Sequence, residues 1–258
     1  MKQLVSGLRQ FQTRYFSSHQ ALFEQLSHGQ KPRVLFVTCS DSRIDPNLIT
    51  QSQVGELFVI RNAGNLIPPY GATNGGEGAA VEYAVQALGI EQIIVCGHSH
   101  CGAMKGLLKL SSLEEEMPLV YEWLKQAEAT RRLIKESYST LEGEQLLNIT
   151  IAENVLTQIE NLRTYPVIHS KLHQGKLHLH AWVYHIETGE VLEYDPVRHG
   201  FVPPDGQVET SLQGCVISQV ESIPSPGQYA AANGANASSR SSEWLSPSQA
   251  ERIYRGSY

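Results

Sequence analysis

Short apolar runs separated by helical patterns dominate the first hundred residues of the chain. Three nearly continuous apolar runs, at 33–38, 56–61 and 92–96, have the length and composition of strands buried on both faces of a sheet. An alanine-rich helical pattern at 77–88 lies between the second and third runs, and Gly89 follows it. This alternation predicts an α/β fold, with a mostly parallel central sheet and helices on both of its faces.

The chain begins with a different pattern. Leu4, Leu8, Phe11 and Tyr15 recur at helical spacing, which predicts a helical arm over residues 1–30. An arm of this kind packs either on a partner subunit or on its own domain, and the spacing does not decide between the two.

The remaining patterns belong to the same domain as the three apolar runs. Helical periodicity extends over 118–138 and 144–162, and the alternation at 178–185 predicts a further strand. A turn then leads to a partner strand at 190–194. We therefore assign residues 31–200 to a single catalytic domain.

Residues 201–258 form a C-terminal extension of unusual composition. From 224 to 242, 16 of 19 residues are Ala, Ser, Pro, Gly or Asn, too polar and too small to bury a core. Apolar residues return at 244–258, so we expect a flexible linker that ends in a short adhesive helix. The alternative is a frayed terminus with no role.

Composition narrows the class of protein. The 258 residues are 41% hydrophobic and 18% charged, with a formal net charge of −6 and no long basic run, so we expect no nucleic-acid partner. No apolar run has the length of a membrane span, and the N-terminal pattern lacks the apolar stretch of a secretion signal. We expect a cytoplasmic protein.

Two short motifs carry the chemistry. Cys39-Ser-Asp-Ser-Arg43 begins where the first apolar run ends, and His98-Ser-His-Cys101-Gly102 begins where the third run ends. The carboxyl ends of parallel strands meet at one edge of a sheet, where α/β folds bind their ligands. If the two strands are neighbours, Cys39, His98 and Cys101 converge.

Two thiolates and one imidazole suit zinc, and three protein ligands leave a fourth position for chemistry. Four cysteines in a chain of this length do not make a disulfide scaffold. The competing interpretation is that the cysteines are ordinary core residues, which is how we interpret Cys96 inside its apolar run. Cys215 receives no role.

With these motifs the sequence resembles the β-class carbonic anhydrases. The resemblance covers roughly residues 30–110, through CSDSR, GELFVIRNAGNLIPPY, GAAVEYAV and GHSHCG. It implies one zinc ion per subunit on Cys39, His98 and Cys101. It also implies that Asp41 pairs with Arg43, which leaves the fourth position to water, or that Asp41 becomes the fourth ligand in a closed state.

The same resemblance implies a pocket for CO₂ and bicarbonate. Its expected substrate-binding residues are Gln30, Phe58, Ala63, Tyr83 and Gly102.

The resemblance also implies an assembly and a place in the cell. The family implies dimers and higher multiples of them, and the long extension is similar to that of carboxysomal enzymes of cyanobacteria. We therefore expect a carbonic anhydrase inside the carboxysome that supplies CO₂ to carbon fixation, with the tail binding a shell or scaffold protein. Two alternatives stay open: a zinc enzyme acting on another small molecule such as CS₂, and a zinc-stabilised scaffold without activity.

Overall fold

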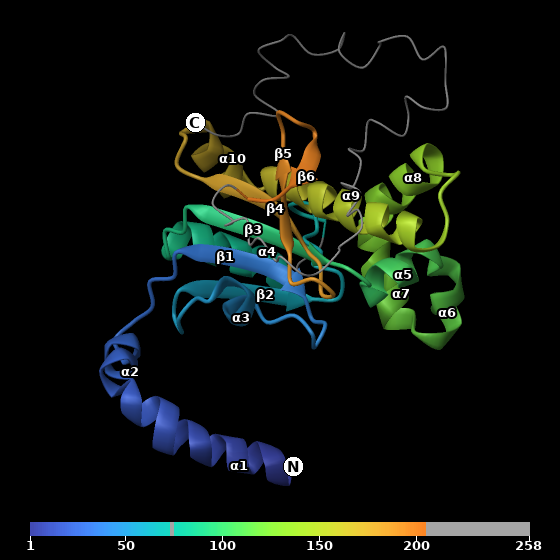
Figure 1. Cartoon of the computed structure of the whole chain (residues 1–258). Helices are drawn as coiled ribbons and strands as arrows, with labels where there is room; N and C mark the ends of the chain where they lie inside the picture. The colour runs from blue at the N-terminus through green and yellow to red at the C-terminus, as the bar shows by residue number, and fades with distance from the viewer. Residues whose placement is uncertain (73–74, 205–258) are drawn as a thin grey trace, which may run out of the picture.

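A computed structural model describes residues 1–72 and 75–204 of the chain (Figure 1). From position 205 onward the predicted C-terminal extension lies outside the described residues, and so do Cys215 and the expected terminal helix. The domain boundaries at 31–200 and 201–258 remain predictions.

One sheet organises the described residues. Its strand order is β2-β1-β3-β4-β5-β6, parallel from β2 to β4 and antiparallel from β4 to β6. The strands are β1 (Val34–Cys39), β2 (Leu57–Asn62), β3 (Gln92–His98), β4 (His178–Tyr184), β5 (Val191–Asp195) and β6 (Gly200–Val202). The predicted mostly parallel sheet is confirmed, and each of the five predicted strands is present within two residues of its expected bounds. The three-residue β6 is too short to give a sequence signal.

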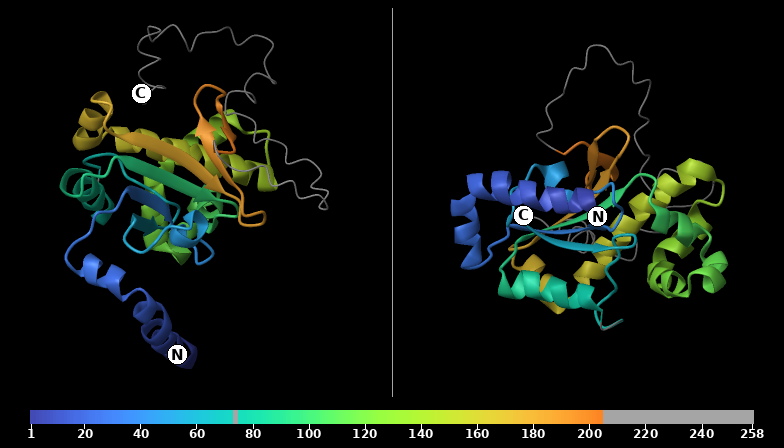
Figure 2. Two further views of the ribbon diagram at one scale, coloured as in Figure 1. Left: turned by 60° about the vertical axis from the view of Figure 1, so that its left-hand side comes forward. Right: turned by 90° about the horizontal axis from the view of Figure 1, so that it is seen from below.

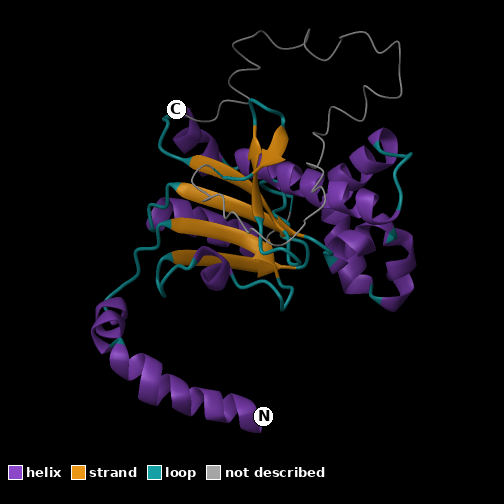
Figure 3. Cartoon of the chain, in the orientation of Figure 1, coloured by secondary structure: helices purple, strands orange, loops and turns teal. Residues whose placement is uncertain are grey.

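Helices precede and connect the strands (Figure 3). They are α1 (Lys2–Gln10), α2 (Gln20–Ser27), α3 (Pro46–Thr50), α4 (Gly76–Glu82), α5 (Gly102–Leu108), α6 (Leu113–Glu116), α7 (Pro118–Leu124), α8 (Glu128–Ser137), α9 (Gly143–Arg163) and α10 (Pro166–His173). Two π-helical segments, Phe11–Phe16 and Tyr83–Ala87, continue α1 and α4. The predicted helix at 118–138 is divided by a 3₁₀ turn at Lys125–Ala127, and α10 was not predicted.

The helices lie on both sides of the sheet, as predicted. Figure 2 shows α4, α9 and α10 on one side and the short α3 on the other. The larger core forms on the first side, where apolar residues of α4 and α9 pack against β1 and β3. A smaller cluster of Phe36, Ile94 and Cys96 occupies the opposite face, with Trp182 packed against it. Cys96 is therefore a core residue, as its apolar run indicated.

Close packing of α9 fixes the end of β3. Gly97 lies directly under this helix, and a Cβ at that position would come within 2.7 Å of Val155 Cγ2 and 3.0 Å of Ile151 Cγ2. Only a residue without a side chain lets the helix approach this closely. The strand residue before His98 is thus held against α9, the longest helix among the described residues.

The N-terminal arm is helical, as predicted, and extends away from the sheet (Figure 1). None of the residues in α1 or α2 is buried, and Leu4 and Leu8 are 66% and 64% exposed. Among the described residues, nothing therefore buries the apolar stripe that predicted the helix.

Within residues 1–72 and 75–204, no helix combines the length and the hydropathy needed to cross a bilayer.

Candidate metal centre

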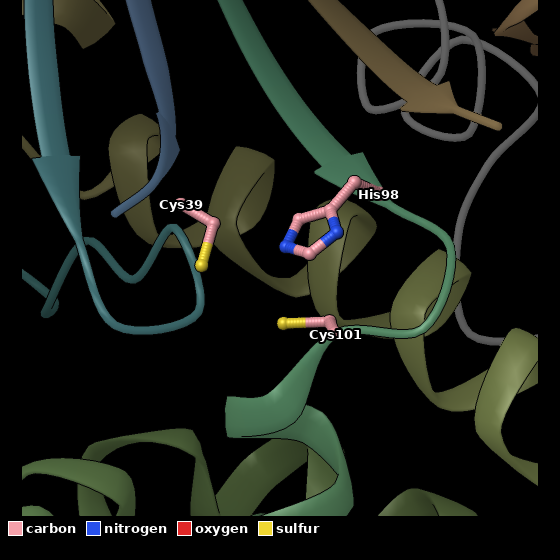
Figure 4. A group of neighbouring side chains, drawn as sticks. All are labelled: Cys39, His98 and Cys101. Atoms are coloured by element: carbon pink, nitrogen blue, oxygen red, sulfur yellow. The ribbon is translucent and has the colours of Figure 1, made fainter. Parts of the chain in front are cut away.

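Three buried side chains converge at the carboxyl edge of the sheet. The sulfurs of Cys39 and Cys101 and a ring nitrogen of His98 all lie within 4.8 Å of one another. Figure 4 shows the two sulfurs and the imidazole pointing into a common space. Cys39 is 6% exposed, Cys101 is 1% exposed and His98 is fully buried. The predicted convergence of Cys39, His98 and Cys101 is therefore present.

The parallel strands bring the donors together. Cys39 is the last residue of β1 and His98 the last residue of β3, and these strands are hydrogen-bonded neighbours. A tight turn follows His98, with His100 in the left-handed region at φ 57°. The turn brings Cys101 back to the strand end, where it precedes the first turn of α5.

One ring nitrogen of His98 is engaged and the other faces the sulfurs. The Nδ1–H group donates a hydrogen bond to the backbone carbonyl of Ser99 at 2.9 Å. That bond fixes the tautomer in which Nε2 carries the lone pair. Nε2 is buried without a hydrogen-bond partner in the described structure. An unpartnered buried acceptor beside two sulfurs is the arrangement that a metal ion completes.

The two sulfurs behave as a coupled pair. A hydrogen bond from Cys101 lowers the pKa of Cys39 to about 4, although burial of the Cys39 thiol opposes the effect. The same hydrogen bond, together with burial, raises the pKa of Cys101 well above its usual range. The pair thus shares one proton, and a divalent cation would take its place because metal ligation requires both thiolates.

Asp41 lies beside the three donors and is held by Arg43. The Arg43 Nε and Nη2 atoms donate to the two carboxylate oxygens at 2.9 and 2.7 Å. These bonds hold the pKa of Asp41 well below its usual range against the effect of burial. Asp41 Oδ2 is 4.0 Å from His98 Nε2, so the carboxylate borders the cluster and stays paired with Arg43.

Arg61 also shapes this edge, and the sequence did not single it out. Its Nε donates to the carbonyl of Cys39 at 3.1 Å and its Nη2 to the carbonyl of Asp41 at 2.8 Å. Both hydrogen bonds go to backbone carbonyls, which every residue has, so the sequence does not predict them.

Two of the expected substrate-binding residues lie next to the donors. Ala63 follows Asn62, the β2 residue that pairs with Cys39, and Gly102 follows Cys101 directly. Both are exposed.

The other three expected pocket residues lie elsewhere in the single chain. Phe58 pairs with Leu35, at the opposite end of β2 from Asn62. Tyr83 is 49% exposed, and its ring centroid is 6.2 Å from that of Phe58. Gln30 precedes β1 and lines a hollow of about 460 Å³ beside α2. The chain by itself does not bring these three side chains to the metal donors.

Comparison with known proteins agrees with the site. The family model for carbonic anhydrase matches residues 34–191, which contain all three donors. A carbonic anhydrase of Synechococcus elongatus is 56% identical over 273 aligned positions, which cover 99% of each chain.

Comparison with solved structures identifies the class of carbonic anhydrase that the chain resembles. The β-carbonic anhydrase CcaA superposes with a TM-score of 0.78 at 70% identity, covering 79% of this chain and 99% of that one. One of two tetrameric β-carbonic anhydrases of Sordaria macrospora superposes with a TM-score of 0.67 at 27% identity, covering 74% and 95%. By fold, sequence and metal donors, this chain belongs to the β-class carbonic anhydrase family.

Proposed function

We propose that the chain binds one zinc ion per subunit through Cys39, His98 and Cys101 and catalyses the reversible hydration of CO₂ to bicarbonate and a proton. The observation that carries the proposal is the group of three buried donors within 4.8 Å, with His98 Nε2 lacking a partner. Two soft thiolates and an imidazole suit zinc better than they suit Mg²⁺ or Ca²⁺, which prefer oxygen ligands. When bound, zinc would supply Lewis-acid activation of water.

Asp41 and Arg43 control access to the fourth position in this proposal. Two thiolates already neutralise a divalent cation, so a carboxylate ligand would make the site anionic and closed. The two-pronged bond from Arg43 keeps the carboxylate off the metal and leaves it as a hydrogen-bond acceptor at the rim. There Asp41 accepts a hydrogen bond from the attacking water and orients it.

The pocket for CO₂ is completed by a second copy of the chain. In one copy, Gln30, Phe58 and Tyr83 lie away from the metal donors, and the exposed ring of Tyr83 borders a hollow of about 640 Å³. The uncovered apolar stripe of the N-terminal arm supports self-association. The relatives from Sordaria macrospora are tetrameric.

The C-terminal extension directs the enzyme to the carboxysome. Residues 244–258 bind a shell or scaffold protein, and the enzyme supplies CO₂ to carbon fixation there. The match to the cyanobacterial Synechococcus elongatus protein over 99% of both chains supports a shared extension.

Cys39→Ser is expected to remove the zinc. Serine offers a poorly acidic hydroxyl in place of a thiolate, so the purified variant should hold far less than one zinc ion per chain by elemental analysis. Cys96→Ala is the matched control, because Cys96 packs on the opposite face of the sheet with Phe36. Full zinc content in Cys39→Ser, or its loss from Cys96→Ala, would contradict the ligand assignment.

Asp41→Asn is expected to lower CO₂ hydration about 100-fold or more while the zinc content stays unchanged. The amide loses the charge that pairs with Arg43 and presents a donor where water needs an acceptor. Stopped-flow hydration assays measure the effect. Asp45→Asn is the control, since Asp45 only caps α3 and asparagine caps equally well. Comparable turnover in both variants would remove Asp41 from the mechanism.

Coexpression tests whether two copies build one pocket. Cys39→Ser disables the metal donors and the double variant Phe58→Ala/Tyr83→Ala disables the distant pocket residues. Mixed dimers should contain one intact site, so their CO₂ hydration should exceed the average of the two variants expressed alone. An activity equal to that average would contradict a pocket shared between two copies, and full activity of the double variant would remove Phe58 and Tyr83 from the pocket.

A tail fusion tests the carboxysome proposal. Residues 240–258 joined to an unrelated carrier protein should enrich shell or scaffold proteins from a lysate of carboxysome-containing cells. A carrier with the same residues in scrambled order is the control. Equal recovery from both carriers would refute a targeting role for the tail.

A further inference from the structure

A row of amide side chains runs along helix α9 on the side that faces the loop after β2. We call Asn154, Gln158 and Asn161 the amide row. Asn154 and Gln158 are each only 1% exposed, although both side chains are polar. Their spacing of four and three residues places them on one face of the helix. Buried amides need hydrogen-bond partners, and these find them in the loop.

The amide row holds the backbone of that loop. Asn154 Nδ2 donates to the carbonyl of Gly64 at 3.0 Å. The amide nitrogen of Ile67 donates to Gln158 Oε1 at 2.9 Å, and Asn161 Nδ2 donates to the carbonyl of Ile67 at 2.9 Å. Gln158 Nε2 donates to Asn154 Oδ1 at 3.0 Å, so neighbouring amides also fix each other.

The helix that carries the amide row also packs against β3, the strand that ends at His98. Val155, adjacent to Asn154, packs so closely on Gly97 that no side chain fits there. Gly97 immediately precedes His98. A displacement of α9 would therefore disturb the strand that carries the imidazole as well as the loop.

The loop reaches the cluster at Gly64. This glycine has φ 84°, and a Cβ there would lie 2.9 Å from Met104 Cε and 3.1 Å from Ala103 Cβ. A hydrogen bond from the Gly64 backbone is among the causes that lower the pKa of the Cys39 thiol. Figure 4 shows the loop after β2 passing close to that sulfur. The loop is thus wedged between α5 and a proposed metal ligand.

We propose that Asn154 and Gln158 are positioning residues that aim the Gly64 N–H at the Cys39 sulfur and so set how strongly this sulfur donates electrons to the metal. The inference rests on the proposed function, because it takes Cys39 as a zinc ligand. A hydrogen bond from an N–H group withdraws electron density from a thiolate. Groups that hydrogen-bond to metal ligands tune metal affinity and reactivity in this way. Neither residue touches the substrate or the metal.

Cobalt substitution separates this role from a merely structural one. Co²⁺ in a thiolate site gives sulfur-to-metal charge-transfer absorption, whose energy rises when the sulfur accepts a hydrogen bond. In Asn154→Leu the Gly64 carbonyl loses its donor, so the charge-transfer band should move to longer wavelength. Because the Cys39 sulfur is then also less firmly positioned, chelator competition should show zinc affinity about 10-fold weaker.

Thr150→Val is the matched control. Thr150 is equally buried on α9, but its hydroxyl bonds only within the helix, to the carbonyl of Leu146. This variant should keep the wild-type band and the wild-type zinc affinity. The thermal midpoints of both variants report any general loss of stability.

Asn154→Asp keeps the test valid if Asn154→Leu does not fold. The carboxylate preserves the shape and the acceptor for Gln158 but cannot donate to Gly64, so the same band shift is expected. A folded Asn154 variant with the band and zinc affinity of Thr150→Val would overturn the inference. Wild-type protein that binds neither Co²⁺ nor zinc would instead refute the proposed function.

Discussion

The parallel pairing of β1 with β3 is the constraint on which the metal centre depends. Their register sets Thr38 beside Cys96, so both strands end at the same edge and deliver Cys39 and His98 there. A shift of one residue would turn every side chain of a strand to the other face and separate the donors. Because both faces of these strands are buried, hydrophobic packing fixes the register, and the polar donors take the positions that the core imposes.

Electrostatics at this edge follows from the same geometry. Two thiolates balance a divalent cation and make it a weaker Lewis acid than three neutral imidazoles would. A third anionic ligand would lower the acidity of bound water further, and in the proposed function the ion pair between Asp41 and Arg43 prevents it. Arg61 also stabilises this arrangement, because its guanidinium donates hydrogen bonds to the backbone carbonyls of Cys39 and Asp41. The negative charge of Asp41 thus lies beside the sulfurs, paired with Arg43.

The parts of the structure that local patterns encode could be predicted from sequence. The apolar runs of β1 and β3 and the two motifs at their ends sufficed for the fold class and the three donors, because strand ends and ligand spacing are short-range properties. Contacts across about ninety residues could not be predicted. In the sequence Asn154 is one of many polar residues of α9, and nothing local identifies Gly64 as its partner. Similarly, the resemblance supplied Phe58 and Tyr83 without saying which copy of the chain contributes them.

Anchoring of the loop by a distant helix has a consequence for protein engineering. The stretch from Asn62 to Tyr70 takes its shape from α9 as much as from its own residues, since side chains between 154 and 165 bind its backbone. Grafting that stretch alone into another scaffold would leave its backbone carbonyl and amide groups without hydrogen-bond partners. A transplant needs the helix as well, so the smallest portable unit of this centre is discontinuous in the gene.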